Sequence, residues 1–459
     1  MTLIEASTSG FPSVAGSTGP ASFYLWTIGC QMNLADSQRL ESALVQLGLH
    51  SVESPKDADV LVFNSCVVRQ QAEDKVVGSL TALAPLKKEN PAQVVALMGC
   101  MVGPKTDDLQ RRFPHVDVFM RPQEYAPLLD LLGERLGLDW EGCVGNLTSD
   151  LTVNNPGVTC YVPIIHGCDL MCSFCIIPYR RGRQVSRPLG EVVHEVELLA
   201  ARGVKEVTLL GQTVDAYGLD LPEKPDLADL MTRLNDTKGL ERIRFLTSHP
   251  SFMSQRIIDA VAELPKVCEH INLPVQSGDN GVLSRMRRPY SQADYRRLVE
   301  RIRKTVPAAS LSTDMIVGFP GETDAEYQNS LDLVSDLRFD KVHCAVYSSR
   351  PGTMADRNME DDVPHDVKTK RRERMDSVQE KVLREVNAGL VGQEVEVLVE
   401  GRQKGKWQGR TRTNKLVFFE DEADRLGELA GVEITQASPW SLQGKLRGSA
   451  AGPSKGIIT

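Results

Sequence analysis

The chain alternates short, almost uninterrupted apolar runs with longer stretches of helical periodicity, and it does so in two successive series. In the first series, the runs FYLWTIG, ADVLVFNS and QVVALMG have the composition of strands buried on both faces, because their apolar residues do not alternate with polar ones. The stretch LADSQRLESALVQLG between the first two runs has helical periodicity and closes at a glycine. We therefore predict a Rossmann-like parallel α/β domain over residues 21–150.

The second series occupies residues 156–388 and has a different rhythm. Helical stretches such as LGEVVHEVELLAARG and SQADYRRLVERIRKTV separate its apolar runs, and a long charged helical stretch closes the series. The six candidate strands are YVPIIHG, EVTLLGQ, IRFLTS, HINLPV, LSTDMIVG and KVHCAVY. Six strand–helix units in series predict a partial (β/α)6 barrel of the TIM type, with its chemistry at the C-terminal ends of the strands.

Helical periodicity ends near residue 389. The short, Gly-punctuated β-rich runs that follow predict a small antiparallel β-barrel over residues 389–449. The Ser/Gly/Pro-rich residues 1–20 and the residues 450–459 are predicted to be tails without fixed structure. The fold class is thus α/β, with three domains in a row and a β-barrel at the end.

The composition predicts the cellular compartment in which the protein works. No segment approaches the roughly 20 consecutive apolar residues of a membrane span, and the N-terminus has neither the basic start nor the apolar core of a signal peptide. We therefore expect a cytoplasmic protein without a membrane partner. Ten cysteines in such a protein are more often metal ligands than disulfides. The net charge of −8 argues against a surface that coats nucleic acid uniformly, but it leaves room for a local basic patch.

Three cysteines follow the first three candidate strands. Cys30, Cys66 and Cys100 each stand at the end of a run or within two residues of it. The C-terminal ends of parallel strands meet at one edge of a sheet, so cysteines some 35 positions apart in the chain can converge there. Cysteine is also a common buried residue, and packing would explain any one of the three. The repeated placement favours a shared metal centre.

A second group of cysteines, Cys168, Cys172 and Cys175, forms a CxxxCxxC motif after the first candidate strand of the second series. Three soft thiolates this close favour zinc, copper(I) or an iron–sulfur cluster. A zinc site would need a fourth ligand, for which His166 is the nearby candidate. A [4Fe–4S] cluster held by three cysteines would instead leave one iron open for a ligand.

The CxxxCxxC motif after the first strand of a partial barrel, with Phe174 just before the last cysteine, resembles the radical S-adenosylmethionine superfamily. That resemblance implies that the open iron of the cluster on Cys168, Cys172 and Cys175 binds S-adenosylmethionine. Reductive cleavage of the bound molecule would then yield a strong hydrogen-atom abstractor.

The resemblance narrows to the methylthiotransferase family. The matching motifs run in family order over nearly all of residues 23–447: TIGCQMNLADSQRL, NSCVVRQQAEDKV, CIIPYRRGRQVSRP, LLGQTVDAYG, NLPVQSGDNGVLSRMRR, STDMIVGFPGET, SSRPGTMA and GRTRTNKLVFF. The resemblance implies a second [4Fe–4S] cluster on Cys30, Cys66 and Cys100, which carries the sulfur. It also implies two molecules of S-adenosylmethionine per turnover, one as methyl donor and one as radical source.

Polar residues at the C-terminal ends of the candidate strands are candidates for binding S-adenosylmethionine. They are Gln212, Gln276, Ser277 and Asp314, with Phe174 of the cysteine motif. Ordinary hydrogen bonding at the barrel rim would explain each polar residue equally well. Beyond the six cluster cysteines, no catalytic residue is assigned.

A basic stretch in the C-terminal region, GRQKGKWQGRTRTNK, has no acidic residue. It combines phosphate-binding side chains with an aromatic one, which is typical of a nucleic-acid contact. A solvated hairpin is the alternative. In the family this position belongs to the small RNA-binding TRAM barrel, so we expect RNA contacts from Arg402, Lys404, Lys406, Trp407, Arg410, Arg412 and Lys415.

The motifs PYRRGRQVSRP, LLGQTVDAYG and GRTRTNKLVFF are most similar to the branch that acts on tRNA. That branch methylthiolates C2 of N6-isopentenyladenosine at position 37. The alternatives within the family are threonylcarbamoyladenosine in tRNA and an aspartate of a ribosomal protein. Ser349 stands where the family usually has proline. The implied partners are the tRNA anticodon stem-loop and an electron donor such as flavodoxin or ferredoxin, and the expected state is a monomer.

A different class of function remains open from the sequence. The chain could be a non-catalytic iron–sulfur protein that binds RNA and senses redox state. Such a protein needs closed clusters with four protein ligands each. The two triads argue against it, and the remaining cysteines (Cys143, Cys160, Cys268 and Cys344) offer no clear fourth ligand.

Overall fold

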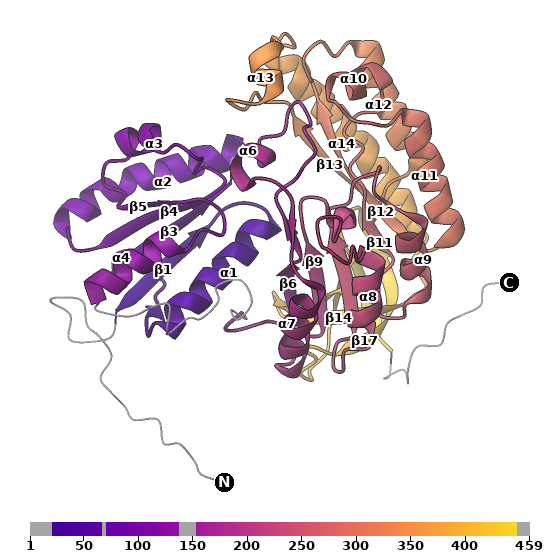
Figure 1. Cartoon of the computed structure of the whole chain (residues 1–459). Coiled ribbons are helices and arrows are strands. Elements are labelled where there is room, and N and C mark those ends of the chain that lie inside the picture. Colours follow the sequence, from indigo (N-terminus) through magenta and orange to yellow (C-terminus); the bar gives the residue numbers. More distant parts are fainter. Residues whose placement is uncertain (1–20, 67–69, 137–152, 448–459) are drawn as a thin grey trace. The chain divides into compact units, whose positions relative to one another are not determined.

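The computed structural model describes residues 21–66, 70–136 and 153–447, so the predicted tails and Cys143 lie outside the described residues (Figure 1). The chain divides into two compact units. One comprises Met1–Asn155 together with Ile177–Arg183, and the other comprises Pro156–Ile176 together with Gln184–Thr459. Among the described residues, none of the helices combines the length and the apolar character that crossing a membrane requires.

The first unit contains a five-stranded parallel sheet with strand order β2-β1-β3-β4-β5. Helices α2 and α3 lie on one side of this sheet and α1 and α4 on the other (Figure 1). The strands are β1 (Ser22–Thr27), β2 (His50–Ser51), β3 (Val60–Ser65), β4 (Val94–Gly99) and β5 (Val118–Met120). The helices are α1 (Gln31–Gln46), α2 (Gln70–Glu89), α3 (Asp107–Arg112) and α4 (Ala126–Leu136). The predicted parallel α/β domain and its three apolar strands are confirmed.

The central strands of this sheet are apolar on both faces because both faces are covered by helices. All six residues of β3 and all six of β4 are buried. One side packs Leu40 and Leu44 of α1 and Leu128 of α4 against the sheet. The sheet thus has a rigid, dry centre, and its strands end at a fixed edge.

The second unit begins with six parallel strands in two adjoining sheets, β6-β9-β10 and β11-β12-β13. Parallel backbone bonds continue across the junction, where Cys268 N–H donates to Ile243 O. The strands are β6 (Thr159–Pro163), β9 (Glu206–Leu210), β10 (Arg242–Leu246), β11 (His270–Asn272), β12 (Ser310–Val317) and β13 (Lys341–Val346). The predicted six-stranded partial barrel is confirmed. Its first apolar run is interrupted, because β6 is followed by the short strand β7 (Ile165–His166), which pairs with β8 (Val185–Ser186).

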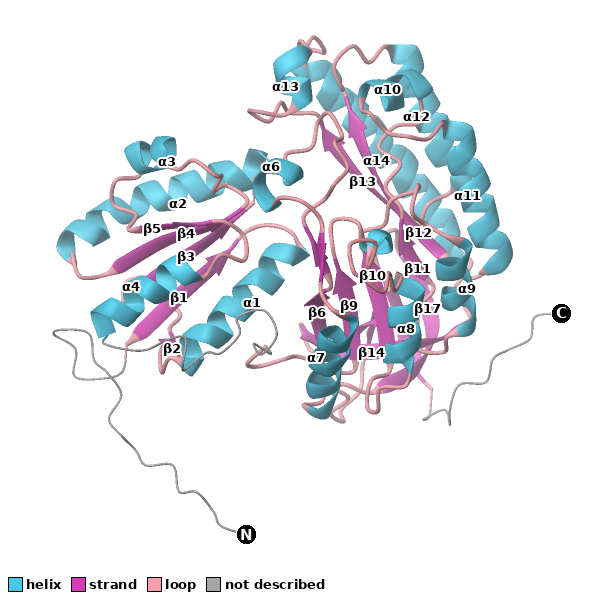
Figure 2. Cartoon of the chain, viewed as in Figure 1, coloured by secondary structure: helices cyan, strands magenta, loops and turns pink. Residues whose placement is uncertain are grey.

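Helices alternate with these strands, as Figure 2 shows. Side-chain caps fix several helix starts: Ser291 and Asp294 form a capping box at the start of α11, and Thr323 and Glu326 form one at the start of α12. The barrel helices are α7 (Leu189–Ala201), α8 (Leu227–Asn235), α9 (Gln255–Glu263), α10 (Asn280–Arg285), α11 (Gln292–Thr305), α12 (Asp324–Leu337), α13 (Met354–Asn358) and α14 (His365–Ala388), with a 3-10 turn at Val214–Ala216.

The chain ends in a closed barrel with strand order β14-β15-β16-β18-β17. Its strands are β14 (Glu394–Gln403), β15 (Lys406–Thr411), β16 (Leu416–Phe419), β17 (Leu429–Ala437) and β18 (Leu442–Leu446). The pairs are antiparallel except β16 with β18, which is parallel. The predicted small β-barrel is confirmed. Closure removes exposed strand edges and encloses an apolar core.

Two arginines of β10 connect the partial barrel to the C-terminal barrel. Arg242 donates to the carbonyl oxygens of Arg410 and Glu396 at 2.7 and 3.2 Å. Arg244 donates to the carbonyl oxygens of Arg412 and Thr411, both at 2.7 Å, and forms a buried ion pair with Glu206 at 2.8 Å. Buried guanidinium groups satisfy strand-end carbonyls that would otherwise lose hydrogen bonds to water. These contacts therefore fix the position of the C-terminal barrel against the strands of the partial barrel.

Candidate cluster sites

The first cysteine triad lies at one edge of the parallel sheet. Cys30 is the N-cap residue of α1, three positions after the end of β1, and Cys66 and Cys100 directly follow β3 and β4. These three strands are neighbours in the sheet, so the three cysteines come together although 70 residues separate the first from the last. Cys66 and Cys100 are buried and Cys30 is exposed. The thiols are close enough that Cys30 and Cys66 act electrostatically on Cys100.

Two asparagines hold the loops that carry these cysteines. Asn33 donates to Asn64 Oδ1 at 2.8 Å and to Ser65 O at 3.0 Å, and its own Oδ1 lies 3.3 Å from Cys30 Sγ. Asn64 donates in turn to Asn33 O at 2.8 Å. Both amides are fully buried. Neither was identified from the sequence, because an asparagine beside a cysteine carries no signal until the fold shows its partner.

Two glycines allow the loops that carry the cysteines to pack closely against their neighbours. Gly99 adopts φ +103°, and a Cβ there would lie 2.4 Å from both Asn64 Oδ1 and Ser65 O. A Cβ at Gly29 would lie 2.6 Å from Asn33 Oδ1 and 3.0 Å from Cys66 Cβ. Both positions therefore require glycine, for conformation at Gly99 and for space at both. Cys30 and Cys100 each follow one of these glycines directly.

A buried ion pair stands beside this triad. Arg181 Nη2 lies 2.8 Å from Asp36 Oδ2, and the two side chains are 2% and 0% exposed. Arg181 is also close enough to the Cys100 thiol to act on it electrostatically. Burial raises the pKa of Cys100 to about 11, while the positive charge of Arg181 opposes that rise. A bound metal would act in the same sense as the arginine, since it binds the thiolate and releases the proton.

The second triad lies on the loop after β7. Gly167, at φ +69°, turns the chain into this loop. Cys168 Sγ lies 3.5 Å from Thr213 Oγ1, and Cys172 Sγ accepts a hydrogen bond from Arg288 Nη1 at 3.5 Å. Burial raises the pKa of Cys168, and the hydrogen bond from Thr213 opposes this effect. Thr213 and Arg288 thus each place a donor beside one cysteine.

Ser173 fixes the same loop between the last two cysteines. It is fully buried; its hydroxyl donates to Arg285 O at 2.8 Å and its N–H to Met286 O at 3.1 Å. Its carbonyl accepts from Ala355 N–H at 2.7 Å. The loop is therefore held from the end of α10 and from α13. Such fixed positioning is what a cluster ligand set requires.

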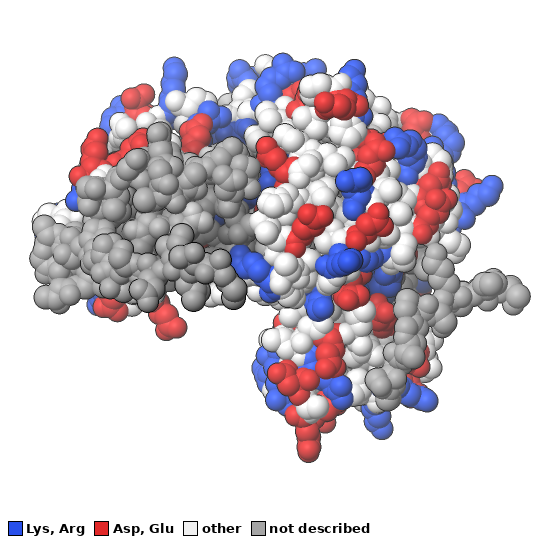
Figure 3. All heavy atoms as spheres, turned by 60° about the horizontal axis from the view of Figure 1, so that its bottom comes forward, with Lys and Arg blue, Asp and Glu red and all other residues white. Residues whose placement is uncertain are grey.

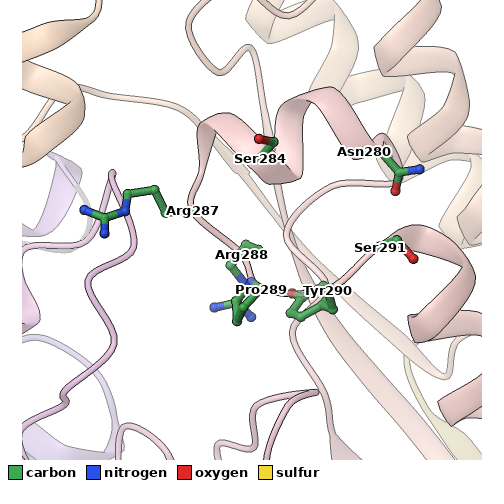
Figure 4. A pocket seen from close by; sticks show the side chains of 7 residues that line it. All are labelled: Asn280, Ser284, Arg287, Arg288, Pro289, Tyr290 and Ser291. Atoms are coloured by element: carbon green, nitrogen blue, oxygen red, sulfur yellow. Dashed lines mark hydrogen bonds between the residues drawn. The ribbon is translucent and has the colours of Figure 1, made fainter.

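Arg288 also borders a cavity of about 480 Å³. Figure 4 shows the residues around it on α10, on the loop after α10 and at the start of α11. Arg288 donates to Tyr290 Oη at 2.7 Å and to Pro274 O at 2.9 Å, so its guanidinium is fixed. The cavity is lined by Asn280, Ser284, Arg287, Arg288, Pro289, Tyr290 and Ser291.

The predicted cofactor-binding residues fall into different environments. Gln212 follows β9, and its buried Oε1 has no hydrogen-bond partner. Gln276, at φ +73°, exchanges backbone hydrogen bonds with β12, where Asp314 lies half-buried. Ser277 is fully buried and accepts from Asp279 N–H within its own loop. Phe174 packs edge-on against Phe319, with ring centroids 6.5 Å apart.

Two buried polar residues near Gln212 were missed from the sequence. Asp215 Oδ2 accepts from His249 N–H at 2.8 Å, whereas Asp215 Oδ1 and His249 Nε2 have no hydrogen-bond partner. Burial raises the pKa of Asp215 to about 8 and lowers the pKa of His249 to about 3. Buried polar atoms without partners are uncommon and mark places where a ligand can bind. With Gln212 Oε1 they suit a polar ligand such as S-adenosylmethionine.

The donor chemistry of the two cysteine triads fits iron–sulfur clusters. Each triad offers three thiols, the ligand type that iron–sulfur clusters use. Three other cysteines lie elsewhere in the second unit: Cys160 in β6, Cys344 in β13, and Cys268 fully buried before β11.

The basic residues of the C-terminal barrel have several roles. Trp407 is 6% exposed in the barrel core, and its indole N–H donates to Asp421 O and Ala423 O. This buried position does not suit the stacking role expected from the sequence. Arg412 pairs with Glu269 at 2.8 Å and Lys415 with Asp340 at 2.7 Å, so both face the partial barrel.

The remaining four basic residues lie on or near the β14–β15 hairpin. Lys404 is exposed at its turn, and Arg402 lies over the Trp407 ring at 5.0 Å. Lys406 pairs with Glu420 at 3.1 Å and Arg410 with Glu400 at 3.7 Å. Figure 3 shows acidic and basic side chains interspersed over the visible face, in keeping with the net charge.

Three family models match separate parts of the chain. The radical SAM superfamily matches residues 162–334, the uncharacterized protein family UPF0004 matches residues 22–121, and the TRAM domain matches residues 389–446. The radical SAM match includes the second cysteine triad, and the UPF0004 match includes the first.

Several relatives match almost the whole chain. The tRNA-2-methylthio-N(6)-dimethylallyladenosine synthase of Herpetosiphon aurantiacus is 48% identical over 431 residues, which cover 93% of this chain and 97% of the relative. The protein of the same name from Roseiflexus sp. is 50% identical over 429 residues, covering 92% and 89%. Its namesake from Chloroflexus aurantiacus is 46% identical over 435 residues, covering 92% and 91%.

Solved structures share the fold at low identity. The radical S-adenosylmethionine methyltransferase TsrM from Kitasatospora setae, with cobalamin and a [4Fe-4S] cluster bound, has a TM-score of 0.54 at 15% identity. The match covers 73% of this chain and 77% of that one. The cobalamin-dependent S-adenosylmethionine radical enzyme OxsB has a TM-score of 0.51 at 11% identity, covering 79% and 56%. These similarities concern the fold alone.

The backbone at Gly99 gives a direct test of the first triad. Gly99→Ala should displace Cys100, because a Cβ there meets Asn64 and Ser65 in a conformation that alanine disfavours. We expect the variant to lose most of the iron that the first triad binds after anaerobic reconstitution, measured in a chain whose second triad is replaced by alanine. Gly78→Ala in α2 is the control, since nothing lies within 4 Å of a Cβ there. If the two variants bound equal amounts of iron, this would contradict the assignment of a cluster to the first triad.

Proposed function

The chain belongs to the methylthiotransferase family of radical S-adenosylmethionine enzymes, and we propose that it methylthiolates C2 of N6-isopentenyladenosine at position 37 of tRNA. The observation that carries the proposal is the 48% and 50% identity, over more than nine-tenths of this chain, to relatives named for that modification. The cysteine placement supports it, because two triads with an open position each suit a reaction that needs both a radical and a sulfur donor.

We assign the first cluster to Cys30, Cys66 and Cys100, and the second to Cys168, Cys172 and Cys175. When bound, these [4Fe–4S] clusters and two molecules of S-adenosylmethionine per turnover supply the radical, the sulfur and the methyl group. Thr213 and Arg288 donate to the second triad and stabilise its thiolates. Ser173 keeps the loop of that triad in place.

Several residues of the partial barrel are proposed to hold S-adenosylmethionine. Gln212, Asp215 and His249 each offer a buried polar atom without a partner in the structure. Asp314 and Gln276 stand on neighbouring backbone segments, and Phe174 contributes an apolar wall beside the cysteines. Ser277 is assigned to the loop itself, because its hydroxyl already bonds within that loop. Their shared task is to orient the sulfonium towards the second cluster.

The RNA contacts are proposed to come from the β14–β15 hairpin. Arg402, Lys404, Lys406 and Arg410 lie there, and surface arginines and lysines bind phosphates without reading sequence. Arg412 and Lys415 are assigned to docking of the C-terminal barrel, because both pair with acidic residues of the partial barrel. Trp407 is assigned to the core of that barrel.

The setting of the reaction belongs to the proposal as well. We propose a cytoplasmic monomer that acts on the anticodon stem-loop, where the target base must leave the stack to reach the clusters. Cleavage of S-adenosylmethionine consumes an electron. We therefore propose a flavodoxin or a ferredoxin as the donor. The three domains are assigned to residues 21–150, 156–388 and 389–449, in keeping with the three family models.

Nucleoside mass spectrometry of tRNA tests the substrate. In a strain that lacks this gene, we expect the 2-methylthio derivative of isopentenyladenosine to disappear and unmodified isopentenyladenosine to accumulate. The gene should restore the product, and a copy with Cys168→Ala should not. Unchanged 2-methylthio-isopentenyladenosine, in a strain without a second enzyme of this kind, would exclude the proposed substrate.

Charge reversal on the hairpin tests the RNA surface. Lys404→Glu with Lys406→Glu should weaken tRNA binding by at least about tenfold and reduce the slope of log affinity against log salt by about 1 for each phosphate that is no longer bound. Lys224→Glu with Lys238→Glu, at two exposed positions between elements of the partial barrel, is the control with the same change in net charge. Binding assays over a range of salt concentrations measure both quantities. Equal weakening of tRNA binding in both proteins would show that the hairpin has no special part.

A further inference from the structure

Two arginines near the first triad come from a segment distant in sequence. Arg180 and Arg181 end α6 (Ile177–Arg181), which begins two residues after Cys175. This segment packs with the first unit although the flanking residues Pro156–Ile176 and Gln184–Thr459 form the second. A five-residue helix has little stability of its own, so specific contacts must hold it there.

Arg181 makes the deepest of these contacts. It pairs with Asp36 of α1, and it is close enough to Cys100 to act electrostatically on the thiol. Its Nη1 is buried and has no hydrogen-bond partner among the described residues. Asp36 is itself fixed in place, since Tyr125 Oη donates to its backbone carbonyl at 3.1 Å. Burial of a guanidinium is costly unless each of its donors meets an acceptor.

Arg180 and Arg121 add two more donors of the same kind. In the part of the chain that the structure describes, the Nε atoms of both are buried without hydrogen-bond partners. Arg121 donates to Arg180 O at 3.2 Å and pairs with Glu124 at 3.1 Å, which fixes the end of α6. The path of Arg180 depends on Gly103, where a Cβ would lie 1.9 Å from Arg180 Nη1. Because Gly103 has no side chain, the Arg180 guanidinium has space beside the cysteine loops.

A purely structural ion pair would not explain this arrangement. A pair of Arg181 with Asp36 needs no thiol beside it, yet the positive charge of Arg181 acts on the Cys100 thiol. Arg181, whose charge acts on Cys100, and Arg180, which lies against Gly103, each keep a buried donor without a partner among the described residues, and together they match an anionic acceptor. The cluster and the sulfur that it carries are the anions that the reaction places there.

We infer that Arg181, fixed by Asp36 and assisted by Arg180, whose carbonyl Arg121 bonds, is a positioning residue that holds the reduced sulfur anion at the open iron of the first cluster. The inference rests on the proposed function, because it presupposes a cluster on Cys30, Cys66 and Cys100. The ligand class is a hydrosulfide or persulfide anion. Guanidinium donors would favour its charged form and orient it for transfer.

The test uses the full chain with Cys168, Cys172 and Cys175 replaced by alanine, so that only the first triad can bind a cluster. After anaerobic reconstitution, iron is counted, and the electron paramagnetic resonance signal of the reduced cluster is followed as sodium hydrosulfide is added. The parent should bind about four irons and change its signal with saturable hydrosulfide binding. A parent without iron would refute the proposed first cluster itself and, with it, this inference.

Arg181→Met combined with Asp36→Asn removes both charges and avoids leaving one buried alone. We expect hydrosulfide binding at least about tenfold weaker than in the parent, as expected for the loss of one charge-assisted hydrogen bond. Arg181→Lys, which keeps the charge, should recover part of this affinity. Arg111→Met is the control, since that arginine is exposed on α3.

The outcomes separate a positioning role from a structural one. A double variant with full iron and unchanged hydrosulfide affinity would overturn the inference. If the double variant binds no iron, the hydrosulfide affinity of the parent is compared instead with that of the single variants Arg181→Lys and Arg180→Met. We then expect weaker hydrosulfide binding in Arg180→Met than in the parent. Parent-like affinity in both of these variants would overturn the inference equally.

Discussion

Parallel strands end together at one edge of a sheet, and both cysteine triads depend on this constraint. Cys66 and Cys100 follow adjacent strands, β3 and β4, whose register fixes the distance between the loops that carry them. The second triad uses the same principle in the partial barrel, where Thr213 after β9 stands beside Cys168. No local motif could gather the first triad, because its cysteines follow strands that are far apart in sequence. The second triad is a local CxxxCxxC motif, and only neighbours such as Thr213 come from other strands.

Buried arginines are the second recurrent device. Arg244 joins β10 to the C-terminal barrel through Glu206 and two carbonyls, and Arg181 joins α6 to α1 through Asp36. A guanidinium can satisfy several acceptors at fixed angles, which gives such contacts direction as well as strength. The pairs differ in one respect. All three nitrogens of the Arg244 guanidinium have acceptors, whereas Arg181 Nη1 has none among the described residues.

Much of this could be predicted from the sequence, because strand runs and helix caps are local signals. The apolar runs located β3, β4 and the six barrel strands, and Ser291 marked the start of α11. The rest depends on contacts that only the fold creates. The pairing of Asp36 with Arg181 spans 145 residues, and the burial of Trp407 follows from closure of the C-terminal barrel around it. A basic, aromatic stretch has the same composition whether its tryptophan faces solvent or the core.

The most direct test of the proposed chemistry follows the hydrogen at the modified carbon. Reconstituted enzyme is incubated anaerobically with S-adenosylmethionine, a reductant and isopentenylated tRNA that carries deuterium at C2 of the target adenosine. Mass spectrometry then measures deuterium in the 5′-deoxyadenosine formed. We expect deuterium to appear there together with the 2-methylthio product, and neither to form when Cys168, Cys172 and Cys175 are replaced by alanine. Product formed with unlabelled 5′-deoxyadenosine would contradict direct hydrogen abstraction from C2.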